Sequence, residues 1–139
     1  MRKDSVSNQM KASVLRERIS PSERISPKDV VALRRRLSPD PGKPLSQQRF
    51  GQLLGVSWST VARWESGGHP DVQMTRTLAR LRLALDALGN MVKPEHRLLF
   101  FEQHHPLLLN VRPIDLLRTE EGAEAVIRLL EGAETGAFA

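Results

Sequence analysis

The chain has 139 residues, a net charge of +5 and no cysteine, which excludes disulfides, thiolate metal sites and cysteine nucleophiles. The charge is uneven, because residues 1–93 hold 17 Lys and Arg against 8 Asp and Glu, whereas residues 94–139 hold 4 against 8. This asymmetry indicates polyanion binding in the first part and a different contact in the second, although basic side chains that only solvate a surface would give the same count.

No segment shows the pattern of export or membrane insertion. The first 18 residues lack the apolar run of a secretory signal. The longest purely apolar runs have four residues, as at 98–101, whereas roughly 20 are needed to span a bilayer. We therefore expect a cytoplasmic protein with no membrane partner.

The N-terminal 25 residues are polar and basic and follow no sustained period. We interpret residues 1–25 as an arm that either is disordered or starts a short helix. The first clear helix follows it, since Ser26 suits an N-cap, Pro27 suits the first helical position, and Asp29 completes a capping box. Apolar residues at helical spacing then predict a helix over 27–37.

Two short helices joined by a tight turn are predicted next, after a loop rich in proline at 38–44. Ser46 is the expected N-cap of the first helix, and Gly55 is expected to end it in the left-handed conformation. Ser57 is the expected N-cap of the second helix, which covers 58–65.

The rest of the chain is also helical by pattern. Four further helices are expected, one over 74–88, one that opens at Pro94, one that opens at Pro113, and one that starts after Gly122 and ends at Gly132. No convincing strand pattern occurs, so we expect an all-α fold. We divide it into a first helical domain over 26–90 and a helical C-terminal domain over 91–139.

The stretch LSQQRFGQLLGVSWSTVARWESG, residues 45–67, resembles the lambda-repressor-like helix-turn-helix of the Xre family. The positions that carry the resemblance are Gln47, Phe50, Gly51, Gly55, Val56, Ser57, Val61, Trp64, Glu65 and Gly67. The resemblance implies that the first short helix crosses the DNA backbone and the second enters the major groove of operator DNA. Because operators are two-fold, it also implies a homodimer.

The resemblance assigns base contacts to Trp58, Ser59 and Arg63. An arginine presents two donors to a guanine, and an indole can pack against a thymine methyl or, alternatively, against a neighbouring helix. The phosphate contacts, which carry little sequence information, are expected at Lys43, Gln47, Arg49 and Thr60.

Other residues of this stretch are expected to hold it together. Five apolar residues should face inward, namely Phe50, Leu54, Val56, Val61 and Trp64. Gly51 allows the two helices to approach closely. Glu65 resembles the acidic residue with which the family pairs an arginine of the first helix, and Arg34 lies where that partner is expected. Arg35 and Arg36 fit a DNA backbone contact and a solvated helix face equally well.

Residues 104–139 resemble the C-terminal toxin-binding domain of the Xre/MbcA/ParS antitoxins. The resemblance is carried by Pro106, Leu108, the block RPIDLL at 112–117, Gly122, the helix through Leu130, Gly136 and Phe138. The family usually has glycines just before the arginine, whereas this chain has Leu109, Asn110 and Val111. The departure affects the turn at that point and leaves the rest of the match in place.

This second resemblance implies a type II antitoxin that inhibits a RES-domain, NAD-consuming toxin and represses its own operon. Arg112, Asp115, Gly136 and Phe138 are the implied toxin contacts. Arg112 and Asp115 could equally cap a local helix, and the tail could be a frayed terminus. The alternative is a stand-alone Xre-family regulator whose C-terminal domain dimerises or senses a ligand.

No enzyme, cofactor or metal is predicted. The adjacent His104 and His105 lack further ligands at metal spacing, and no strand leads into a glycine-rich phosphate loop. The carboxylates at 120–124 are interpreted as a solvated helix face near a helix N-terminus.

Overall fold

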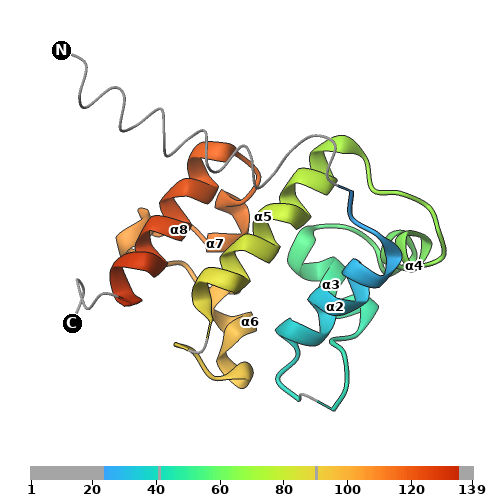
Figure 1. Cartoon of the computed structure of the whole chain (residues 1–139), viewed down its shortest axis with the longest axis horizontal. Helices are drawn as coiled ribbons and strands as arrows, with labels where there is room; N and C mark the ends of the chain where they lie inside the picture. The colour runs from blue at the N-terminus through green and yellow to red at the C-terminus, as the bar shows by residue number, and fades with distance from the viewer. Residues whose placement is uncertain (1–23, 41, 90, 135–139) are drawn as a thin grey trace.

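The computed structural model describes residues 24–40, 42–89 and 91–134. Nearly all of the predicted arm, together with Gly136 and Phe138, lies outside these ranges. The described residues form the helices α2 (Pro27–Leu37), α3 (Gln47–Leu54), α4 (Trp58–Glu65), α5 (Val72–Leu88), α6 (Pro94–Glu102), the 3-10 turn η1 (Pro106–Leu108), α7 (Pro113–Leu116) and α8 (Glu120–Glu134) (Figure 1). The described residues form no strand beyond an isolated bridge between His105 and Val111, which confirms the all-α prediction.

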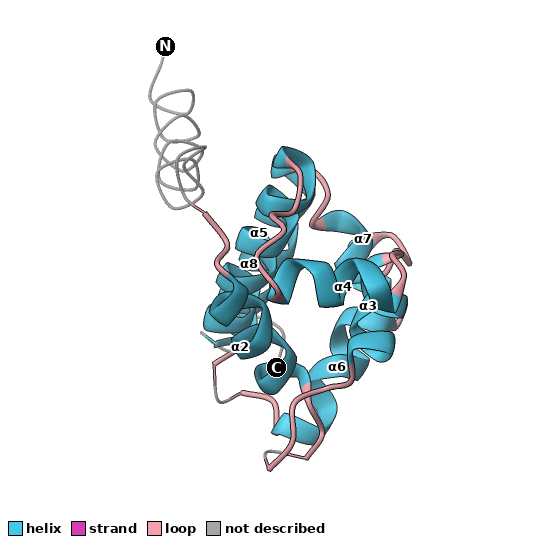
Figure 2. Cartoon of the chain, turned by 90° about the vertical axis from the view of Figure 1, so that its right-hand side faces the viewer, coloured by secondary structure: helices cyan, strands magenta, loops and turns pink. Residues whose placement is uncertain are grey.

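The long helix α5 runs through the middle of the molecule. Figure 1 shows α2, α3 and α4 on one side of it and α7 and α8 on the other. Helix α8 packs directly against α5, while α6 contacts both α2 and α7. Figure 2, turned by 90°, shows the helices joined by loops, with no strand drawn among the described residues. The two parts of the chain therefore share a central helix.

One apolar core extends through both parts. It contains Phe50 and Trp64 from the first part, Leu81 of α5, and Phe101 and Val126 from the second. Burying side chains of this size contributes about 1.5–3 kcal/mol each to folding before entropy is counted. The division at residues 90 and 91 stays a prediction, and the core has members on both sides of it.

The predicted helix starts at the three serines are confirmed. The Ser26 hydroxyl accepts from the Asp29 backbone N–H at 3.1 Å, and the Asp29 carboxylate accepts from the Ser26 N–H at 2.8 Å, which completes the capping box. The hydroxyls of Ser46 and Ser57 cap α3 and α4 through the N–H groups of Arg49 and Thr60. Each such cap stabilises a helix by about 1 kcal/mol.

Three predicted boundaries in the later helices are wrong. Helix α5 begins at Val72 instead of 74, because the Asp71 carboxylate caps it by accepting from the Met74 N–H at 2.7 Å. Helix α8 begins at Glu120 and runs through Gly132 to Glu134. A glycine inside a helix costs only about 1 kcal/mol relative to alanine, so Gly132 does not end it.

Gly122 lies inside α8 because of packing and does not mark its start. A Cβ atom at this position would overlap the backbone carbonyl of Leu116, so the glycine lets α8 pass close to the end of α7. The Thr119 hydroxyl accepts from the Gly122 N–H at 3.0 Å and caps the helix.

Within the described ranges, none of the helices combines the length and apolar character that a membrane crossing requires.

Candidate nucleic-acid interface

The turn between α3 and α4 is as tight as predicted. Gly55 ends α3 with φ of 78°, in the left-handed region that glycine adopts without steric cost. The Val56 N–H donates to the Gly51 carbonyl at 2.9 Å. A Cβ atom at Gly51 would lie 2.5 Å from the Val56 carbonyl oxygen. Gly51 therefore allows α3 to approach the backbone of the turn, and the turn sets the angle to α4.

The predicted inward face of the two helices is largely buried. Phe50, Leu54, Val61 and Trp64 belong to the core, and Val56 packs against it while half-buried. This packing fixes one side of α4 against the protein and leaves the opposite side exposed to solvent.

Arg34 and Glu65 lie in direct contact. The Arg34 Nε and Nη2 atoms each donate to one Glu65 carboxylate oxygen at 2.8 Å, a bidentate geometry that is among the strongest available to these side chains. The Arg34 guanidinium also donates to the Leu45 carbonyl, and the Leu45 N–H donates to the Arg34 carbonyl at 2.9 Å. Arg34 thus connects α2, the segment before α3, and the end of α4.

The exposed side of α4 carries the three predicted base contacts. Trp58 is 59% exposed, and Ser59 and Arg63 are also exposed. Glu65 is the one carboxylate of α4, and it is held by Arg34. Gly68 makes room for the stem of Arg63, because a Cβ atom there would lie 2.6 Å from the Arg63 Cγ. The charge presented by this side of the helix is therefore positive.

The four predicted phosphate contacts differ in how free their polar groups are. Lys43 is exposed, and the half-buried Thr60 has its hydroxyl 3.0 Å from the Ser57 hydroxyl. Gln47 donates to the Glu65 carboxylate at 3.3 Å. Arg49 forms an ion pair with Glu102 at the end of α6. Lys43 is therefore exposed, whereas the Thr60 hydroxyl, Gln47 and Arg49 already have protein partners, and the four phosphate contacts stay predictions.

Arg35 and Arg36, which fit either a DNA backbone contact or a solvated helix face, differ in their surroundings. Arg35 is exposed, whereas Arg36 donates to the Asp86 carboxylate of α5 at 2.9 Å. This pair is partly exposed, so it contributes little to stability.

In the C-terminal part, Arg112 and Asp115 pair with each other. Arg112 Nε and Nη2 donate to the two Asp115 carboxylate oxygens at 2.8 and 2.9 Å, across the first turn of α7. The hydrogen bonds from Arg112 lower the pKa of Asp115 and raise that of Arg112. The geometry is that of a local ion pair at the start of α7, and the Arg112 side chain makes no capping hydrogen bond to the helix backbone, so both interpretations of these two residues stay predictions.

The loop before Arg112 has an unusual backbone. Leu109 and Asn110 both have φ of 58°, which is the left-handed region, and a leucine there costs roughly 1–2 kcal/mol. They are two of the three positions, with Val111, at which the resembled family usually has glycines. The Asn110 N–H donates to the His105 carbonyl at 2.9 Å and the Leu107 N–H donates to the His105 Nδ1 at 3.2 Å. Leu109 is 91% exposed, so the strained loop presents an apolar side chain to solvent.

Sequence reasoning missed a buried cation in α5. Arg80 is buried and donates to the Leu117 carbonyl at 3.2 Å, while its Nε has no hydrogen-bond partner. Burial lowers its pKa, and the nearby Glu120 acts in the opposite direction. An arginine on an amphipathic helix is normally predicted to lie at the surface, so nothing in the sequence indicates that Arg80 is buried. Arg80 connects α5 to the end of α7.

Among the described residues, no three His, Cys, Asp or Glu side chains are grouped so that they could hold a metal ion. Comparisons with protein-family models, with curated proteins and with solved structures each return no significant match for this chain.

Proposed function

We propose that this protein binds double-stranded DNA through the exposed side of α4 and regulates transcription, without enzymatic activity, in the cytoplasm. The observation that carries the proposal is the composition of that side. Trp58, Ser59 and Arg63 are exposed together, while the one carboxylate of the helix is withdrawn into contact with Arg34. A carboxylate on this surface would repel phosphates, and its removal leaves a surface suited to a polyanion.

In this proposal α3 and α4 act as a helix-turn-helix. The exposed side of α4 enters the major groove, where Arg63 donates to a guanine and Trp58 contacts a thymine methyl. Lys43 and Thr60 contact phosphates and fix the register. Two copies bind a two-fold operator, so the mass of the complex on a promoter duplex should correspond to two chains.

The test is fluorescence anisotropy with a duplex from the region upstream of the protein's own gene and an unrelated duplex of equal length. Arg63→Gln should weaken binding to the upstream duplex about 10- to 100-fold and binding to the unrelated duplex far less. The matched control is Arg128→Gln, which removes the same charge from the exposed side of α8 and should change neither affinity by more than about two-fold. Equal losses on both duplexes would mean that Arg63 contacts phosphate only.

We further propose that the C-terminal part binds and inhibits a toxin encoded beside this gene, and that the protein is an antitoxin which represses its own operon. The resemblance to antitoxins implies a RES-domain toxin that consumes NAD. The backbone supports the proposal at one point, because Leu109 and Asn110 adopt the left-handed conformation where that family has glycines. The exposed Leu107 and Leu109 supply apolar surface for a partner beside this turn.

This second proposal is tested by expressing the neighbouring gene alone, with the full chain, and with the double variant Leu107→Ser, Leu109→Ser. The neighbour alone should arrest growth and lower cellular NAD, the full chain should restore both, and the double variant should restore neither. The variant must retain wild-type affinity for the promoter duplex, which shows that it is folded. A harmless neighbour, with promoter binding intact, would instead indicate a stand-alone regulator.

A further inference from the structure

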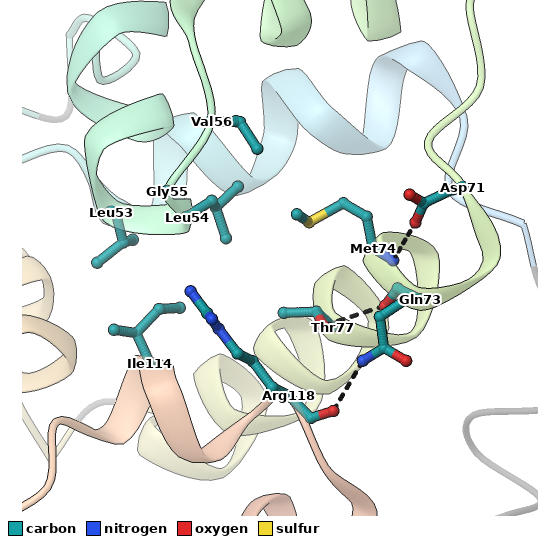
Figure 3. A pocket seen from close by; sticks show the side chains of 10 residues that line it. All are labelled: Leu53, Leu54, Gly55, Val56, Asp71, Gln73, Met74, Thr77, Ile114 and Arg118. Carbon is teal, nitrogen blue, oxygen red and sulfur yellow. Dashed lines mark hydrogen bonds between the residues drawn. The ribbon is translucent and has the colours of Figure 1, made fainter.

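A cavity of about 260 Å³ lies between the α3–α4 turn, the start of α5 and the end of α7 (Figure 3). Its walls are contributed by both parts of the chain, with Leu54, Gly55 and Val56 from the turn and Ile114 and Arg118 from the C-terminal part. The cavity is partly open to solvent. It is smaller than most sites for drug-sized ligands, so its volume suits a small metabolite.

The cavity combines apolar walls with one cation. Leu54, Met74 and Ile114 line it, and Figure 3 shows the Arg118 side chain extending into it toward the turn. The Arg118 Nη2 lies 3.5 Å from the position that a Cβ atom would take at Gly55. A larger residue at position 55 would therefore narrow the cavity beside the guanidinium.

The Arg118 backbone is anchored while its charge remains available. Its carbonyl accepts from the Gln73 Nε2 of α5 at 2.8 Å. Asp115, three residues earlier, is held by two nitrogens of Arg112 and interacts with the Arg118 charge only at longer range. The other carboxylate that lines the cavity, Asp71, caps α5 through the Met74 N–H. Within the described ranges, no carboxylate forms an ion pair with Arg118 at 4 Å or less.

We propose that this cavity binds a small organic carboxylate with a short aliphatic chain. The carboxylate pairs with the Arg118 guanidinium, which suits planar two-oxygen groups, and the chain lies against Leu54, Met74 and Ile114. Because the walls include the α3–α4 turn, occupancy changes the surroundings of the helix pair that we propose for DNA binding. The inference goes beyond the proposed function and does not rest on it.

The test is a titration of the full chain, labelled at Leu, Met and Ile methyl groups, with hexanoate and separately with hexan-1-ol. We expect hexanoate to shift the methyl resonances of Leu54, Met74 and Ile114 in a saturable manner. Hexan-1-ol should bind at least about 10-fold more weakly, because a hydrogen bond to a charged group is lost. Arg118→Gln should weaken hexanoate binding by a similar factor, whereas Arg35→Gln, which removes an exposed charge on α2, should not.

Three outcomes would overturn the proposal. The first is the absence of saturable shifts at these methyl groups, and the second is equal binding of hexanoate and hexan-1-ol. The third is unchanged hexanoate binding by Arg118→Gln. Arg118→Lys, which keeps the charge but loses the planar fork, should bind hexanoate with intermediate affinity and serves as the variant if Arg118→Gln does not fold. Because no DNA is present in the titration, its failure leaves the DNA-binding proposal to its own test.

Discussion

The region of α2–α4 and the region of α6–α8 each contain a bidentate arginine–carboxylate pair, yet the two pairs have different structural effects. Arg34 and Glu65 are 31 residues apart, and their side chains are 11% and 13% exposed. Arg112 and Asp115 are three residues apart and are 33% and 35% exposed. The first pair joins helices that are distant in sequence and so sets how α4 is presented. The second pair spans only the first turn of α7 and joins no two helices. The positions of α7 and α8 therefore depend on the packing of the core.

The largest expected difference between the regions is the cost of breaking these pairs. Glu65→Leu should lower the free energy of unfolding by about 3 kcal/mol, because it leaves the buried Arg34 charge uncompensated. Asp115→Leu should lower it by less than about 1 kcal/mol, since the pair is partly exposed. Urea unfolding followed by circular dichroism measures both. The double variant Arg34→Met, Glu65→Leu should recover most of the loss, and equal costs in the two regions would contradict the comparison.

A second comparison concerns glycines inside helices, at which we expect the two regions to behave alike. Replacing glycine by alanine in an open helix stabilises it by up to about 1 kcal/mol. Gly122→Ala should instead destabilise the protein by about 2 kcal/mol, because the new Cβ meets the Leu116 backbone. Gly51→Ala, the counterpart in the other region, meets the Val56 carbonyl and should have the same sign. Thermal unfolding gives the sign directly, and a gain in stability at Gly122 would show that α7 and α8 are not held this closely.

A third experiment concerns the ion pair that connects the two regions. Arg49 of α3 is held by Glu102 of α6, so Glu102→Gln should free it to contact a phosphate. The plot of log affinity for DNA against log salt concentration should then steepen by about 1. Glu95→Gln, an equal charge change at an exposed position of α6, is the control and should leave the slope unchanged. Identical slopes for both variants would mean that Arg49 does not reach the DNA backbone.

The smallest expected effect is the pH dependence of the Arg112–Asp115 pair. The hydrogen bonds from Arg112 lower the Asp115 pKa below its ordinary value of 3.8. A carboxyl whose pKa is lowered by folding stabilises the protein above that ordinary value, and the contribution is lost as the pH falls further. The difference in unfolding free energy between wild type and Asp115→Asn should therefore be constant from pH 7 to 5 and shrink below pH 4. A difference that persists undiminished at pH 2 would contradict the role of the pair.

Much of the fold was predictable because helix boundaries depend on nearby residues. The caps at Ser26, Ser46 and Ser57 and the glycine turn at Gly55 act within three or four positions. The Asp71 cap of α5 is equally local and could have been found from the same rule. In the candidate DNA-binding site, the exposed positions on α4 were also predictable, because helical spacing gives them once the apolar face is known.

Apart from the Arg34–Glu65 pair, which the family resemblance implied, tertiary structure alone decided the contacts between elements that are distant in sequence. Arg49 pairs with Glu102 across 53 residues and Arg80 donates to Leu117 across 37, and neither partner is marked by spacing or composition. From the sequence, Gly122 is expected to interrupt a helix. In the structure it lies inside α8 because a side chain there would meet the Leu116 carbonyl. Local backbone preferences act over a single turn of helix, whereas burial and ion pairing depend on which side chains the whole chain brings together. The sequence therefore determined where helices begin, and packing decided which charges remain free to meet a partner.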